Sequence, residues 1–158
     1  MLQRIQTVYL ALAAIASLLV FFFPLAGFYN FGIQGNYKFF VCAIQSMDPE
    51  PVIHFTKWIT LPLILLMLLS FIFSAATLFL YKKRSVQIRL IAFNVLINIV
   101  FIILVFFFYV PKIKNLALIE PSYGIAIVFP LAAMVFLIIA NRSIRKDEAL
   151  VRSTDRLR

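Results

Sequence analysis

The sequence predicts an all-α membrane protein in which four transmembrane helices form an antiparallel bundle, as one domain over residues 1–158. Composition is the first reason: 64% of the residues are hydrophobic and 13% are charged, about half the charged share of a soluble domain. The second reason is that four stretches without charged residues are each long enough, at about 20 residues, to cross a bilayer. The third is that Lys and Arg collect on one side of these stretches.

The first uncharged stretch lies between Arg4 and Lys38, and its densest apolar part indicates a span at about 8–27. A cleaved signal peptide would have a shorter apolar run, of about 7–15 residues, followed by a pattern of small residues. The segment 24–27 lacks that pattern. We therefore expect an uncleaved first helix.

Three further spans are predicted at about 58–81, 90–110 and 122–141. Each should be an α-helix, because hydrocarbon offers no partner to backbone N–H and C=O groups. The connections between these spans are short, which makes neighbouring helices antiparallel. Pro62 and Pro130 are the positions at which we expect kinks.

The basic residues predict the orientation of the spans. Eleven Lys and Arg residues fall on the side that holds both chain ends and the connection between the second and third spans, and four fall on the other side. The positive-inside rule then places both termini in the cytoplasm. Aromatic residues near the span ends are expected to anchor the helices at the interfaces: Trp58, Tyr81, Tyr109 and Tyr123.

The longest connection, at 28–57, is expected to form a small extracytoplasmic cap. Residues 37–44 favour β-structure and follow a candidate turn at 34–36, so a short β-hairpin is one form that this cap could take. The last segment, 142–158, contains no Pro or Gly. We expect it to continue the fourth helix as a cytoplasmic tail.

Polar residues interrupt the apolar stretches of the second and third spans. Asn94 and Asn98 are four residues apart, as are Ser70 and Ser74, so each pair shares one face of its helix. These side chains could line a path for an ion or small solute, or they could join the helices by hydrogen bonds worth about 0.6 kcal/mol each. We favour interhelical contacts, because no charged residue accompanies the four side chains.

Reactive groups are sparse. No Asp, Glu, Lys, Arg or His lies inside a predicted span, which argues against a pump or a proton-coupled carrier. In the outer loop, His54 lies near Asp48 and Glu50, but a metal site needs several ligands that converge. Cys42 is the only cysteine, which excludes an intrachain disulfide. We expect no catalytic residue, no metal site and no cofactor.

Two charged regions are candidate contact surfaces. Basic residues around the connection between the second and third spans are expected to contact anionic lipid headgroups, at about 1 kcal/mol each; they are Lys82, Lys83, Arg84 and Arg89. The mixed charges of the tail are expected to bind a membrane-protein partner; they are Arg145, Lys146, Glu148, Arg152, Asp155 and Arg156. The bilayer, anionic lipids and such a protein are the expected partners, and nucleic acid is not.

The two chain ends carry a resemblance. The opening MLQRIQTVYL at 1–10 and the closing IRKDEALVRSTDRLR at 144–158 resemble a Bacteroidota family of short four-span proteins of uncharacterised function. The resemblance covers the whole chain and implies a bacterial inner-membrane location, but no activity. The layout is also similar to that of claudins, although the first outer loop has only Trp58 and Cys42 and lacks the Trp and paired-Cys signature of that group.

These observations favour a non-enzymatic accessory or assembly subunit of a membrane complex. It would dock through its spans, its outer cap and its tail. The alternative is a small-solute or ion pathway formed by oligomerisation around the face of Asn94 and Asn98. A lipid-modifying enzyme has little support, because no carboxylate–histidine pair lies within or beside the spans.

Overall fold

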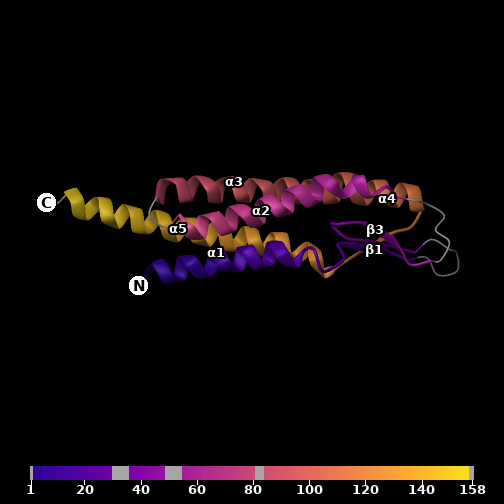
Figure 1. Cartoon of the computed structure of the whole chain (residues 1–158), viewed down its shortest axis with the longest axis horizontal. Helices are drawn as coiled ribbons and strands as arrows, with labels where there is room; N and C mark the ends of the chain where they lie inside the picture. The colour runs from indigo at the N-terminus through magenta and orange to yellow at the C-terminus, as the bar shows by residue number, and fades with distance from the viewer. Residues whose placement is uncertain (1, 30–35, 49–54, 81–83, 157–158) are drawn as a thin grey trace.

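The protein is an elongated bundle of helices with a small β-sheet at one end (Figure 1). The computed structural model describes residues 2–29, 36–48, 55–80 and 84–156. Helix α1 begins, and helix α5 finishes, at the end of the bundle away from the sheet.

Three helical segments among the described residues are long and apolar enough to cross a membrane: Trp58–Phe79, Arg84–Ala117 and Ile125–Ala149. Helix α1 (Leu2–Leu19) is a fourth, shorter apolar helix. The prediction of a mostly helical protein is therefore confirmed, and three of the four expected spans correspond to helices that are long and apolar enough to cross a membrane.

Helix α1 starts and ends earlier than the predicted span at 8–27. Two tight i→i−3 hydrogen bonds of 3.1 Å, from the N–H groups of Phe21 and Phe22, close its last turn. The helix does not continue because Pro24 lacks an N–H and restricts the residue before it. The end of the predicted span lies instead in strand β1 (Ala26–Phe28).

Two further helices each follow a short 3₁₀ turn: η1 (Lys57–Thr60) precedes α2 (Leu61–Phe79), and η3 (Ile125–Ile127) precedes α5 (Val128–Arg156). Pro62 and Pro130 lie in the first turns of α2 and α5, where a missing N–H costs no hydrogen bond. Each proline therefore lies near the start of its helix, where a bend would displace only the short 3₁₀ turn before it. Helix α5 continues to Arg156, so the tail is helical, as predicted.

The helix that contains the predicted third span is much longer than that span. Helix α3 (Arg84–Ile103), the π-helical segment η2 (Leu104–Tyr109) and helix α4 (Val110–Ala117) form one continuous helix. The helix continues past residue 110, where the predicted span ends, because it passes through Pro111. It ends at Leu118, whose left-handed φ of 56° and N–H bond to Lys114 O (2.8 Å) cap the last turn.

The π-helical segment explains how the helix passes a proline. In an α-helix the ring of Pro111 would press on the carbonyl of Phe107, and its missing N–H would leave that carbonyl without a partner. Here the N–H of Val110 reaches back five residues to Val105 O, which widens the turn just before the proline. Helix α4 then starts with Pro111 in its first turn, where proline is tolerated.

The cap is a four-stranded antiparallel sheet built from the two segments that connect α1 to α2 and α4 to α5. Its strands are β1, β2 (Tyr37–Phe39), β3 (Ile44–Ser46) and β4 (Pro121–Tyr123), in the order β3-β2-β1-β4. Strands β2 and β3 form a short hairpin, closed by a 2.9 Å bond from Phe40 N to Ala43 O. Its turn lies inside the β-prone segment 37–44, and not at 34–36, where the sequence suggested a turn. Strand β4 was not predicted: it occupies the start of the expected span at 122–141, and α5 begins only at Val128.

Apolar side chains form two separate clusters along the bundle. The larger one joins the sheet to α2 and to the half of the continuous α3–η2–α4 helix that lies near the sheet. It includes Phe28, Phe39, Met67, Phe101 and Val105. The smaller one lies toward the other end of the bundle and joins α1, α3 and α5 through Leu10, Ala13, Ile91, Leu137, Ala140 and Ile144. A layer of buried polar side chains lies between the two clusters.

The contact between β4 and the chain before β1 leaves no room for a side chain at Gly124. A Cβ there would lie 2.1 Å from the carbonyl oxygen of Pro24. We expect Gly124→Ala to lower the free energy of unfolding by about 1–3 kcal/mol, because backbone must move to relieve the overlap. Thermal unfolding of the detergent-purified protein measures the effect, with the exposed Ser122→Ala as control. An unchanged melting temperature for Gly124→Ala would show that this close approach is absent.

Candidate functional site

A layer of small polar side chains crosses the middle of the bundle. It contains Ser17 of α1, Ser70 and Ser74 of α2, and Asn94 and Asn98 of α3, all with an exposed fraction of 0%. The four residues that the sequence singled out therefore face the interior together. Ser17 was missed, because it follows the small residues Ala13, Ala14 and Ala16 in a stretch that is otherwise typical of helix packing.

The hydrogen bonds of this layer cross between helices. Asn94 Nδ2 donates to Ser74 Oγ (2.7 Å) and to the carbonyl oxygen of Ser70 (3.0 Å). Asn98 Nδ2 lies 3.0 Å from Ser70 Oγ, and Ser70 Oγ lies 3.1 Å from Ser17 Oγ. The hydroxyl of Ser70 thus connects α1 and α3 through α2.

These contacts favour the packing interpretation of the two asparagines. Their amides are turned toward neighbouring helices rather than toward the outer surface of the bundle, where a second copy would bind. Hydroxyls and amides also do not titrate near neutral pH, so the layer offers hydrogen bonding and no proton transfer.

A second set of polar contacts lies near the end of the bundle away from the sheet. The side-chain amide of Gln6 in α1 donates to the carboxylate of Asp147 in α5, and Arg84 Nη1 of α3 lies 3.4 Å from the carbonyl oxygen of Asp147. Gln87 Nε2 donates to the carbonyl oxygen of Thr77 at 3.0 Å. Sequence reasoning did not single out these residues, because Gln87 and Asp147 lie among charged residues that looked solvated and Gln6 lies before the predicted first span.

The predicted lipid contacts are placed only in part. Arg89 is exposed on α3, and Arg84 is half-buried by its contact with α5. Lys82 and Lys83 lie outside the described residues. Of the two predicted lipid contacts that the structure describes, Arg89 faces outward, and Arg84 joins α3 to α5.

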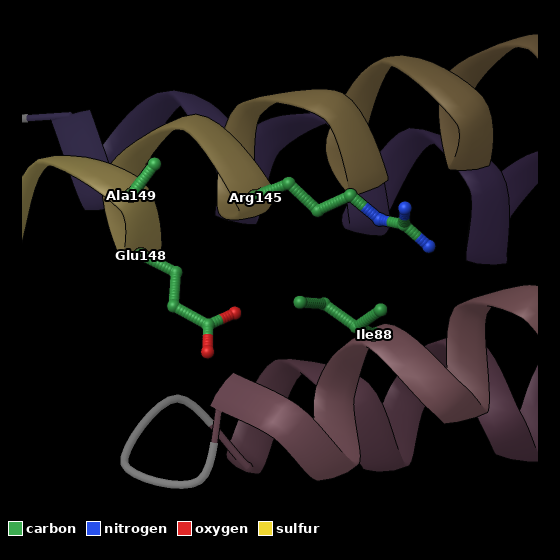
Figure 2. Close-up of a pocket in the computed structure, with 4 residues that line it drawn as sticks. All are labelled: Ile88, Arg145, Glu148 and Ala149. Atoms are coloured by element: carbon green, nitrogen blue, oxygen red, sulfur yellow. The ribbon is translucent and has the colours of Figure 1, made fainter. Parts of the chain in front are cut away.

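The predicted partner-binding residues divide along α5. Arg145 and Lys146 are exposed and Glu148 is half-buried. Arg145 and Glu148 line an open hollow between α5 and α3, together with Ile88 and Ala149 (Figure 2). The backbone of Arg152, Asp155 and Arg156 is helical, and their side chains lie outside the described part of the structure.

The outer loop contains the remaining candidates. Asp48 accepts a 2.7 Å hydrogen bond from the backbone N–H of Asn36, which ties the end of the hairpin together, and Cys42 is exposed. Glu50 and His54 lie outside the described residues. Among the residues that are described, no three His, Cys, Asp or Glu side chains converge in a way that could hold a metal ion.

Two of the expected interfacial aromatics behave differently. Trp58 is 75% exposed at the start of η1, as an interfacial anchor should be. Tyr109 is only 3% exposed: its ring stacks on Phe39 at 5.8 Å, and its hydroxyl donates to Ile59 O at 2.7 Å. The expectation for Tyr109 is therefore wrong, because the sheet covers the position where lipid headgroups were expected.

The polar layer predicts a specific loss of stability. Asn94→Ala removes two bonds to α2, and we expect the free energy of unfolding to fall by about 1–2 kcal/mol. Unfolding in mixed micelles of increasing SDS content measures this loss. Asn115→Ala, at an exposed position of α4, is the matched control. Equal stabilities of the two variants would mean that the Asn94 bonds contribute nothing to the bundle.

Comparison with known proteins places the chain in a family. One family, described as a domain of unknown function (DUF4293), matches residues 2–157. No curated protein and no solved structure matches the chain. The family match agrees with a resemblance that covers the whole chain and attaches no activity to it. Because the match covers nearly its full length, the chain belongs to the DUF4293 family of domains of unknown function.

Proposed function

We propose that the protein crosses the bacterial inner membrane four times, with α1 as the first span and both termini in the cytoplasm. Helix α1, with 18 residues, is about 27 Å long, close to the thickness of a bilayer core. Ile5, Val8, Leu12 and Ile15 recur at helical spacing and are all exposed, at 38–55%. An apolar stripe of this length is unfavourable in water and suits lipid.

The orientation rests on the basic residues and on the resemblance of the chain ends. The start of α1, the start of α3 and the end of α5 lie at one end of the bundle. In the sequence, eleven of the fifteen Lys and Arg residues occur in or next to these three segments. The sheet would then lie on the extracytoplasmic side, where few cations occur.

Thiol labelling tests this topology with the native cysteine. Cys42 is exposed near the sheet, so a membrane-impermeant maleimide should label it when added from the periplasmic side. A Ser153→Cys variant in a Cys42→Ser background should react only after the inner membrane is permeabilised. The unlabelled Cys42→Ser chain is the control. Labelling in the reverse order would contradict the proposed orientation.

The function we propose is that of a non-enzymatic accessory or assembly subunit of a membrane complex. The observation that carries it is the projection of α5 beyond the other helices at the end away from the sheet (Figure 1). A helix that extends past its own bundle has a surface that the bundle does not cover. The last part of the α5 sequence includes Arg152, Asp155 and Arg156, and mixed charges suit a protein partner more than a lipid surface of a single charge.

The first turns of the tail pack against the other helices of the bundle. Ile144 is 1% exposed, and Asp147 accepts hydrogen bonds from α1 and α3. Removing the whole segment 142–158 would therefore damage the fold as well as any docking surface. A truncation that starts after Ala149 is a sharper test.

We expect the chain that lacks residues 150–158 to insert and fold as the full chain does, but to lose the protein that co-purifies with it in mild detergent. Membrane fractionation and the melting temperature report on folding, and mass spectrometry of the purified sample reports on the partner. A second variant, Arg152→Glu with Arg156→Glu, keeps the length of the helix and should have the same effect. Unchanged co-purification in both variants would contradict docking through the tail.

An ion or small-solute pathway is the weaker candidate. It would need the amides of Asn94 and Asn98 to face a second copy, and the hydrogen bonds to Ser70 and Ser74 turn them inward. We therefore favour the accessory role.

A further inference from the structure

A mixed-charge hollow lies between α3 and α5, toward the end of the bundle away from the sheet (Figure 2). Its volume is about 320 Å³, and it is open to the surroundings. Ile88 of α3 and Ala149 of α5 form apolar parts of its wall, and Arg145 and Glu148 of α5 supply one charge of each sign. The hollow therefore combines a cation, an anion and an apolar floor in one small site.

The two charged groups of the hollow, on Arg145 and Glu148, lie at different positions along α5. In Figure 2 the guanidinium of Arg145 extends away from Ala149, back along α5, while the carboxylate of Glu148 lies on the other side of Ile88. The preceding part of α5 is its apolar segment. With α5 inserted as proposed above, on which this inference rests, the cation lies nearer the hydrocarbon and the anion nearer the cytoplasm.

Arg145 is suited to a phosphate group. Its Nε donates a hydrogen bond to Asn141 Oδ1, with 3.3 Å between the two atoms, and this bond orients the planar guanidinium. The two terminal nitrogens carry donors in the fork geometry that matches two phosphate oxygens. The residue is exposed, so a phosphate can approach from the lipid side without displacing another helix.

Glu148 makes the site different from a simple anionic-lipid patch. A carboxylate near a bound phosphate repels an anionic headgroup, but it accepts hydrogen bonds from a primary ammonium. Because a carboxylate can accept several hydrogen bonds, an ammonium can bind there while Glu148 keeps its contacts within the protein. A quaternary ammonium has no N–H to donate.

We propose that this hollow binds the headgroup of a zwitterionic phospholipid with a primary ammonium, of the phosphatidylethanolamine type. Arg145 holds the phosphate, Glu148 holds the ammonium, and Ile88 packs against the glycerol and the first acyl carbons. The polarity of the headgroup, with its phosphate nearer the hydrocarbon, matches the order of the two charges on α5.

Native mass spectrometry of the full chain in detergent tests the proposal with three phospholipids of identical acyl chains. We expect phosphatidylethanolamine to bind roughly tenfold more tightly than phosphatidylcholine or phosphatidylglycerol, as one charge-assisted hydrogen bond allows. Glu148→Gln should remove this preference, and Arg145→Gln should weaken the binding of all three lipids. Arg142→Gln and Lys146→Gln, at exposed positions of α5 outside the hollow, should change neither.

The measurement on the unchanged chain is decisive without any variant. Equal binding of the three lipids, or tighter binding of phosphatidylglycerol, would overturn the proposal. Soluble phosphoethanolamine should fail to compete at the concentration of the lipid, and effective competition would overturn the assignment to a lipid. The chain that lacks residues 150–158 retains Arg145 and Glu148, so its preference for phosphatidylethanolamine should persist. This result does not depend on whether the tail binds a protein partner, so the two proposals can fail separately.

Discussion

Hydrogen bonds between α2 and α3 in the middle of the bundle fix how far one helix is shifted along the other. Asn94 of α3 donates to the backbone carbonyl oxygen of Ser70 and to the hydroxyl of Ser74, both in α2. A shift of one helix by one turn would therefore leave buried amide groups without partners. In hydrocarbon such groups cannot turn to water. The position of Tyr109 opposite Ile59 follows from this register, because the helix between Asn94 and Tyr109 is continuous.

The sheet depends in turn on where Tyr109 lies. Its ring stacks on Phe39 of β2, and the outer part of the long helix covers the buried face of the sheet. The π-helical turn before Pro111 lets that helix continue to Ala117 and so reach past the start of α2. Without this turn the proline would end the helix where the predicted span ended, and the sheet would lose one of its supports.

The two ends of the molecule are built differently. At one end, both outer connections join in one sheet, and Gly124 permits the close approach between them. At the other end, α5 is tied to α1 and α3 through Asp147 and then projects beyond them. A compact cap at one end and a projecting charged helix at the other are the two features on which the proposed accessory role depends.

The sequence by itself determined that the chain forms long apolar helices, because the length and polarity of each segment depend on local composition alone. It also pointed to the inward pairing of Ser70, Ser74, Asn94 and Asn98, since four-residue spacing defines a helix face without knowledge of the fold. The structure decided what depends on distant segments: β4 joins β1 across more than ninety residues, and the sheet turns Tyr109 from an expected interfacial anchor into a core residue. Helix ends were also decided there, because Tyr109 of the π-helical segment bonds to Ile59 and the strand at 121–123 pairs with β1, contacts that no local pattern contains.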